Sequence, residues 1–174
     1  MNYFDQESKR LRFRKLTSDD IPSWIEFFKN NDRLHFLGMD LSKDKAVLAK
    51  EWVMMQLERY QTQGLGHLAV ELKTSGAFIG MGGILPRVLE GKTEYEVAYS
   101  LLPKFWGKGY GTEIAIQMKA FGLKQINSDR LISIIEVNNV DSIKVAKKNG
   151  MKALFETEYL GMEVVVYGVT NEGL

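Results

Sequence analysis

The alternation of apolar and polar positions divides the chain into short strands and amphipathic helices. Residues 11–16 alternate apolar with basic side chains, which is the period of a half-buried strand. After capping residues at 17–20, apolar side chains recur at helical spacing over 24–28, and a longer helical stretch covers 42–60. Both helices are rich in aromatic residues, which either fill the core or in part line a substrate cleft.

Three strands joined by tight turns follow these helices. They are predicted at residues 67–72, 78–85 and 93–101. In the third strand, alternation assigns neighbouring side chains to opposite faces. One face carries Glu94, Glu96, Ala98 and Ser100, and the other carries Tyr95, Val97, Tyr99 and Leu101.

The rest of the chain alternates helix and strand. We expect a helix from Thr112 to about Lys124, then a buried strand at 130–137. A short helix that ends at 149–150 comes next, and a hairpin over 154–169 closes the pattern. There is no internal repeat, low-complexity tract or linker.

This order of elements predicts one mixed α/β domain across residues 1–174, with an ordered core of about 9–170. The 23 basic and 22 acidic residues give a net charge of +1, so neither nucleic acid nor an acidic membrane surface is an expected partner. No apolar run approaches the roughly 18 residues of a membrane span. The N-terminus lacks the apolar core of a signal peptide, so we expect a cytoplasmic protein.

The absence of cysteine excludes disulfides, thiolate metal sites and cysteine nucleophiles. His35 and His67 lie far apart in the sequence and form no ligand pair, so no metal is expected. Each histidine is interpreted as a polar surface or core residue.

A glycine-rich turn at residues 106–112 is the clearest candidate for chemistry. Glycines alternate at 107, 109 and 111, directly before a helix. Bare amide N–H groups and the positive end of a helix dipole together favour an anion. The spacing matches neither a Rossmann turn nor a P-loop, so the turn alone leaves a plain connection open.

The chain resembles the GNAT acetyltransferase superfamily, and within it the RimJ/RimL-type branch. The resemblance rests on three motifs, at residues 96–103, 105–113 and 139–150, which fall in the right order. It implies a central, mostly antiparallel sheet of about seven strands, splayed between strands 4 and 5 and flanked by about four helices.

The same resemblance implies acetyl-CoA as co-substrate. The glycine-turn amides would hold its pyrophosphate, and the splayed edge of the fourth strand would pair with its pantetheine arm, where one N–H would polarise the thioester carbonyl. The lysines at 144, 147 and 148 of the last motif, and Lys152 just after it, either reach the outer phosphates or form a solvated face. The implied cofactor-binding residues are Ser100, Leu101, Leu102, Trp106, Gly107, Lys108, Gly109, Tyr110, Gly111, Thr112, Asn139 and Ser142.

Acetyl transfer to an amine needs a base, because only the neutral amine attacks. Glu96 matches the glutamate of the branch, and Glu94 on the same face is the fallback. Many GNAT enzymes carry a tyrosine where this chain has Ala146, so the resemblance assigns Ser142 to the leaving thiolate. The alternative for Ser142 is a helix cap. Without a cysteine, direct transfer is the expected mechanism.

The resemblance leaves the acceptor open. A protein N-terminus, such as that of a ribosomal protein, is the first choice, and polyamines, aminoglycosides and amino-acid-like amines are alternatives. A non-catalytic acetyl-CoA sensor and an adaptor domain are the other functional classes, and the protein is expected to be a monomer or a homodimer. Four residues are candidates for acceptor choice: Trp24, Phe28, His35 and Trp52.

Overall fold

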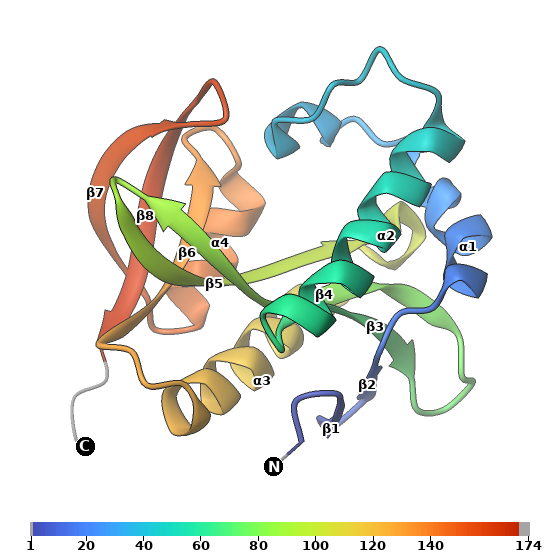
Figure 1. Cartoon of the computed structure of the whole chain (residues 1–174), viewed down its shortest axis with the longest axis horizontal. Helices are drawn as coiled ribbons and strands as arrows, with labels where there is room; N and C mark the ends of the chain where they lie inside the picture. The colour runs from blue at the N-terminus through green and yellow to red at the C-terminus, as the bar shows by residue number, and fades with distance from the viewer. Residues whose placement is uncertain (1, 171–174) are drawn as a thin grey trace.

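A single eight-stranded sheet carries helices on both faces in the computed structural model, which describes residues 2–170 (Figure 1). Residues 1 and 171–174 of the predicted domain lie outside the described residues. The strands are β1 (Asp5–Glu7), β2 (Leu11–Arg14), β3 (Gly66–Leu72), β4 (Phe78–Leu89), β5 (Lys92–Leu101), β6 (Arg130–Glu136), β7 (Lys152–Tyr159) and β8 (Met162–Thr170). The helices are α1 (Ile21–Ile25), α2 (Lys45–Thr62), α3 (Tyr110–Gln125) and α4 (Val140–Lys148).

The sheet divides between β5 and β6. Strands follow the order β1-β2-β3-β4-β5-β6-β8-β7, and every neighbouring pair is antiparallel except β5 and β6. That parallel pair has one register point, Glu96 opposite Ile132. Beyond it β5 runs on away from β6, β7 and β8 (Figure 1). The mixed α/β fold and the splay between the predicted fourth and fifth strands are therefore confirmed.

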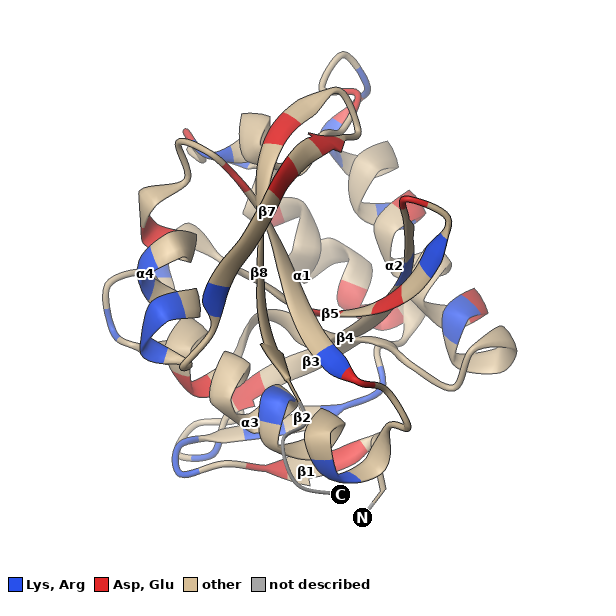
Figure 2. Ribbon diagram, turned by 90° about the vertical axis from the view of Figure 1, so that its left-hand side faces the viewer, with Lys and Arg blue, Asp and Glu red and all other residues tan. Residues whose placement is uncertain are grey.

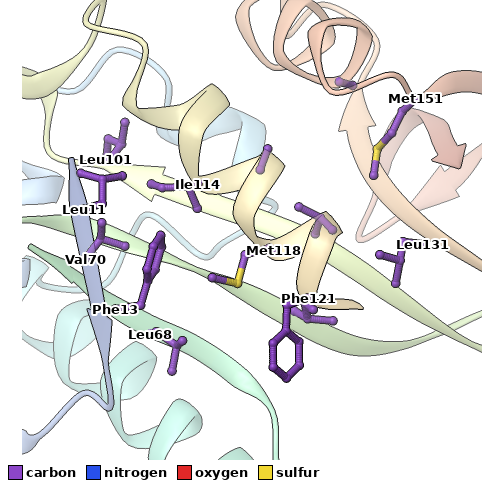
Figure 3. Packing of buried hydrophobic residues seen from close by; sticks show 14 of the residues in the cluster. Leu11, Phe13, Leu68, Val70, Leu101, Ile114, Met118, Phe121, Leu131 and Met151 are labelled. Atoms are coloured by element: carbon purple, nitrogen blue, oxygen red, sulfur yellow. The ribbon is translucent and has the colours of Figure 1, made fainter. Parts of the chain in front are cut away.

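Alternation along the strands sorts the core into two layers. On one face, α3 packs Ile114 and Met118 against side chains of β2 and β3, among them Phe13 and Leu68 (Figure 3). On the other face, α1 and α2 cover Ala69 and Met81 of β3 and β4, together with an aromatic cluster. Glu96 faces the α2 side and Val97 the α3 side, as the alternation of the third predicted strand requires.

Several boundaries differ from the predictions. The sheet has eight strands because β1, a short polar segment without an apolar period, pairs with β2. The first helix has only five helical residues between 3₁₀ turns. The second begins at Lys45 because Asp44 accepts a hydrogen bond from the Ala46 N–H at 2.8 Å.

None of the helices described within residues 2–170 is long and apolar enough to cross a membrane. The same part of the chain gathers no group of three His, Asp or Glu side chains that could hold a metal ion.

Candidate active site

The glycine turn ends at the start of α3, two residues earlier than predicted. Gly109 occupies the N-cap position with a φ of 79°, and the first helical hydrogen bond joins the Glu113 N–H to the Gly109 carbonyl at 3.1 Å. The amides of residues 110–112 therefore precede the helical ladder, and their N–H groups point out of the helix end. Thr112 lies in the first turn and is not the cap. This end of α3 is suited to an anion.

Arg10 and Glu113 hold the turn in shape. Glu113 Oε1 accepts hydrogen bonds from the Ser8 hydroxyl and the Arg10 N–H, both at 2.7 Å. The Arg10 side chain donates to Glu113 Oε2 at 2.6 Å and to the Lys108 carbonyl at 3.0 Å. Burial raises the pKa of Glu113, but the hydrogen bonds from Ser8 and Arg10 outweigh it, and the pKa lies below its usual value. The β1–β2 connection therefore pre-orders the turn.

The free edge of β5 is formed by Tyr99 and Leu101. The Leu102 N–H donates to the Ile79 carbonyl at 2.9 Å, so this N–H points toward β4 and is already paired. Ser100, two residues earlier, shares that direction, so the backbone groups of Tyr99 and Leu101 point toward the splay. The Leu101 carbonyl accepts from the Trp106 indole N–H at 2.9 Å. Of the predicted stretch from Ser100 to Leu102, only Leu101 has its backbone groups on this free edge, and Tyr99 lies beside it there.

A groove of about 430 Å³ runs from the glycine turn to the splay. Leu102 is buried in the α1–α2 core and Lys108 is exposed, so neither lines it. Of the lysines in the last motif, Lys144 and Lys148 line the groove, on the basic helix α4 (Figure 2). The predicted cofactor residues that do line it are Ser100, Leu101, Trp106, Gly107, Gly109, Tyr110, Gly111, Thr112, Asn139 and Ser142.

Ser142 lies in the first turn of α4 with its hydroxyl against Tyr99. The cap of α4 is Asn139, whose Oδ1 accepts a hydrogen bond from the Ser142 N–H at 3.3 Å. The capping alternative for the Ser142 side chain is therefore wrong. The Tyr99 and Ser142 hydroxyls are hydrogen-bonded. Burial raises the pKa of Tyr99 to about 12, although the bond to Ser142 opposes this rise, so Tyr99 stays protonated at neutral pH.

A second cavity, of about 320 Å³, adjoins the groove through the splay. Tyr99, Ser100, Asn139 and Ser142 line both spaces. Glu96 lines only the second cavity, is 8% exposed, and accepts a hydrogen bond from Arg87 Nε at 2.8 Å.

Glu94, the fallback base, lies outside both cavities. It is equally buried, but the Arg130 guanidinium binds its carboxylate in a close ion pair. The two glutamates therefore lie on one face of one strand, and each is paired with its own arginine, but only Glu96 lines a cavity.

The α2 side of the cavity differs from the prediction. Trp24 and Phe28 are buried in the aromatic cluster and His35 lines neither space, whereas Trp52 does line the cavity. His67, which was interpreted as a surface or core residue, is 5% exposed and lines the cavity as well. Sequence reasoning missed Arg59 and Arg87, which also line it, because no motif or period marks them.

A loop and a hairpin meet over the cavity. Gly38, with a φ of 66°, lies so close to the β7–β8 turn that an added Cβ would be 2.9 Å from Leu160 Cβ and 3.0 Å from Met162 Cε. Only a residue without a side chain allows this approach. The contact joins the segment before α2 to the last hairpin.

A family model described as an acetyltransferase (GNAT) domain matches residues 10–152 of the chain. Among curated relatives, the uncharacterized protein YkkB of Bacillus subtilis (strain 168) is 32% identical over 144 residues, which span 82% of this chain and 81% of YkkB.

Solved structures resemble the chain over nearly its whole length. An acetyltransferase from Agrobacterium tumefaciens str. C58 matches with a TM-score of 0.78 at 24% identity, over 95% of this chain and 93% of that one. A RimL ribosomal L7/L12 α-N-protein acetyltransferase in complex with coenzyme A matches with a TM-score of 0.74 at 16% identity, over 94% of this chain and 95% of that one. At these identities, the two matches show a similarity of fold alone.

Proposed function

Because the chain belongs to the GNAT acetyltransferase family, in its RimJ/RimL-like branch, we propose that it moves the acetyl group of acetyl-CoA directly to a primary amine, with Glu96 as general base. One observation carries the assignment: Glu96 is a buried carboxylate in the cavity that adjoins the glycine-turn groove at the splay.

The residues of the groove suit coenzyme A. The amides of residues 110–112 offer N–H donors to the pyrophosphate, and Lys144 and Lys148 offer charge to the outer phosphates. The edge of Tyr99 and Leu101 offers backbone hydrogen bonds to the pantetheine amides. Acetyl-CoA supplies the thioester when it is bound.

Glu96 takes the proton that the acceptor must lose. A lysine-like amine has a pKa near 10.4 and an α-amine near 8, so both are largely protonated at neutral pH. Glu96 accepts this proton directly or through a water molecule. The neutral nitrogen then attacks the thioester carbon, and a backbone N–H of the β5 edge stabilises the oxyanion. As the C–S bond breaks, the nitrogen loses its second proton to water and the amide forms.

The Ser142 hydroxyl stabilises the departing sulfur. A thiol has an ordinary pKa near 8.5, so the thiolate that forms when the C–S bond breaks needs a hydrogen bond and not a full proton transfer. Ser142 donates that bond to the sulfur, and the neighbouring Tyr99 hydroxyl turns to donate to the Ser142 oxygen. No covalent acetyl-enzyme is formed.

The test compares two buried glutamates on one strand. Glu96→Gln keeps an oxygen for Arg87 but loses the base, so the turnover number should fall by about a hundredfold or more, while calorimetry finds the Kd for acetyl-CoA nearly unchanged. Glu94→Gln disturbs an equivalent ion pair with Arg130 outside the cavity and should keep its turnover.

Two results would contradict the proposal. Full activity in Glu96→Gln would exclude Glu96 as the base. Failure of the wild-type protein to bind acetyl-CoA at millimolar concentration would refute the assignment of the groove.

A further inference from the structure

The α2 side of the cavity gathers hydrogen-bond donors that the proposed transfer does not use. His67 comes from β3, Arg87 from β4 and Arg59 from α2, and all three side chains line the cavity with Glu96. These donors lie on the acceptor side, away from the glycine turn.

His67, at the wall of this cavity, carries a buried N–H. Its Nδ1 accepts a hydrogen bond from the Trp52 indole N–H at 3.2 Å, so the proton of the neutral ring is on Nε2. Nε2 is buried and has no hydrogen-bond partner among residues 2–170. A buried donor without a partner costs about 1–3 kcal/mol. Because Nε2 has almost no accessible surface, His67 shapes the wall of the cavity and does not itself reach a ligand.

Arg59 is a half-buried guanidinium without a carboxylate partner. Its hydrogen bond to Gln56 Oε1 is long, at 3.4 Å, and no ion pair joins it to a carboxylate in the described part of the chain. Burial lowers the pKa of Arg59, and the nearby Arg87 lowers it further, whereas Glu96 and Glu58 act in the opposite direction. Desolvation and like charge both favour the entry of an anion.

The electrostatic field in the corner of the cavity formed by Arg59, Arg87 and His67 is positive. Burial first, and then Arg87 and Arg59, lower the pKa of His67 to about 3, with no acidic group among the causes. Two further carboxylates line the cavity, and each has a partner of its own. Glu51 is bound by Lys43 at 2.9 Å, and Glu136 accepts from the Asn138 N–H at 2.7 Å.

We propose that the acceptor amine carries a carboxylate, which Arg59 and Arg87 bind while the amine meets Glu96. This inference rests on the proposed acetyl transfer. The rest of the lining includes apolar residues, among them Met55, Leu160 and Met162, which suit an apolar side chain. The substrate class is therefore an apolar α-amino acid or a peptide whose acidic residue follows its N-terminus.

The experiment compares matched acceptors with acetyl-CoA and follows CoA release. L-amino acids are tested against their carboxamides, which keep the shape but lose the charge. Peptide amides of the form Leu-Asp and Leu-Asn separate a side-chain carboxylate from the carboxylate of a free amino acid. We expect kcat/KM for the charged member of at least one pair to exceed that of the neutral member by about tenfold or more.

Variants then test whether Arg59 causes the preference for carboxylate-bearing acceptors. Arg59→Gln should abolish the preference by raising KM for the carboxylate-bearing acceptor, and Arg59→Lys should restore it in part. Arg12→Gln removes an exposed arginine that pairs with Glu7 at the far edge of the sheet, and it should change nothing.

The outcomes separate this inference from the proposed function. Equal kcat/KM values for the charged and neutral acceptors would overturn the carboxylate inference and leave acetyl transfer standing. A preference for the charged acceptor that survives in Arg59→Gln would do the same. If no amine in the panel is acetylated, the inference is wrong, and the acetyl-CoA titration decides separately whether the proposed function fails with it.

Discussion

At the residue scale, the neighbours of a side chain decide its role more than its type does. Strand alternation and a family motif identify Glu96, but they cannot separate it from Glu94, because both face the same way. The two glutamates are distinguished by β6, which pairs with β5 at Glu96 and then diverges, so Glu96 lines the cavity. Arg87 was missed for a related reason: it is twenty positions from His67 in sequence, and neither segment reveals the pairing of β3 with β4 that puts both residues at one cavity.

Tyr99 provides the prediction at this scale. Tyr99→Phe removes the hydroxyl that is hydrogen-bonded to Ser142 and leaves the ring in place. A hydrogen bond that helps to stabilise a charged group contributes about 1.5–3 kcal/mol, so kcat should fall by about tenfold to a hundredfold. Steady-state kinetics measure this fall, and calorimetry should find the affinity for acetyl-CoA retained. An unchanged kcat would remove the Tyr99–Ser142 pair from the mechanism.

At the element scale, periodic segments could be predicted and their ends could not. Long patterns gave α2, α3 and the strands β3 to β6 within a few residues. The start of α3 was misplaced because Thr112 is a good cap by type, whereas Gly109 takes the position through its left-handed backbone. The restraint on the glycine turn comes from Arg10, about a hundred residues earlier, and no local signal reveals such a contact.

The close approach of α3 to β5 provides the next prediction. A Cβ at Gly111 would lie 3.2 Å from Tyr99 Cε2, at the wall of the groove. Gly111→Val should therefore displace the ring, narrow the groove and raise the Kd for acetyl-CoA by about tenfold or more. Isothermal titration calorimetry measures the change. Ala120→Val adds the same side chain on the exposed side of α3 and should leave the Kd unaltered.

At the scale of the whole molecule, the order of elements predicted the mixed α/β fold. The cavity, in contrast, arises where segments that are distant in sequence pack together. The family resemblance implied one splayed sheet flanked by about four helices, and the structure has this sheet. The sequence did not indicate that the α2 face would bury a histidine near two arginines, because burial depends on how α2 lies across β3 and β4.

The buried histidine makes stability depend on pH. The pKa of His67 is lowered to about 3, whereas an unfolded histidine has a pKa near 6.5. The unfolded state therefore binds the proton preferentially between these values, so the contribution is complete above about pH 6.5 and is lost as the pH falls toward 3. From pH 7.5 to pH 5, the free energy of unfolding should drop by about 2 kcal/mol through this group alone.

Urea denaturation at both pH values tests this dependence. His67→Gln removes the titrating ring, so its loss of stability between pH 7.5 and pH 5 should be smaller than that of the wild type by about the same amount. Equal losses in the two proteins would show that His67 does not control acid stability.

The contact of Gly38 with Leu160 bridges two segments that lie on either side of the splay, and so turns an open gap into a ring. We expect the two reactants of the proposed transfer to occupy the two adjoining spaces, the cofactor the groove and the amine the cavity beside this bridge. Neither reactant then needs to leave before the other binds, so initial-rate kinetics should show a ternary complex.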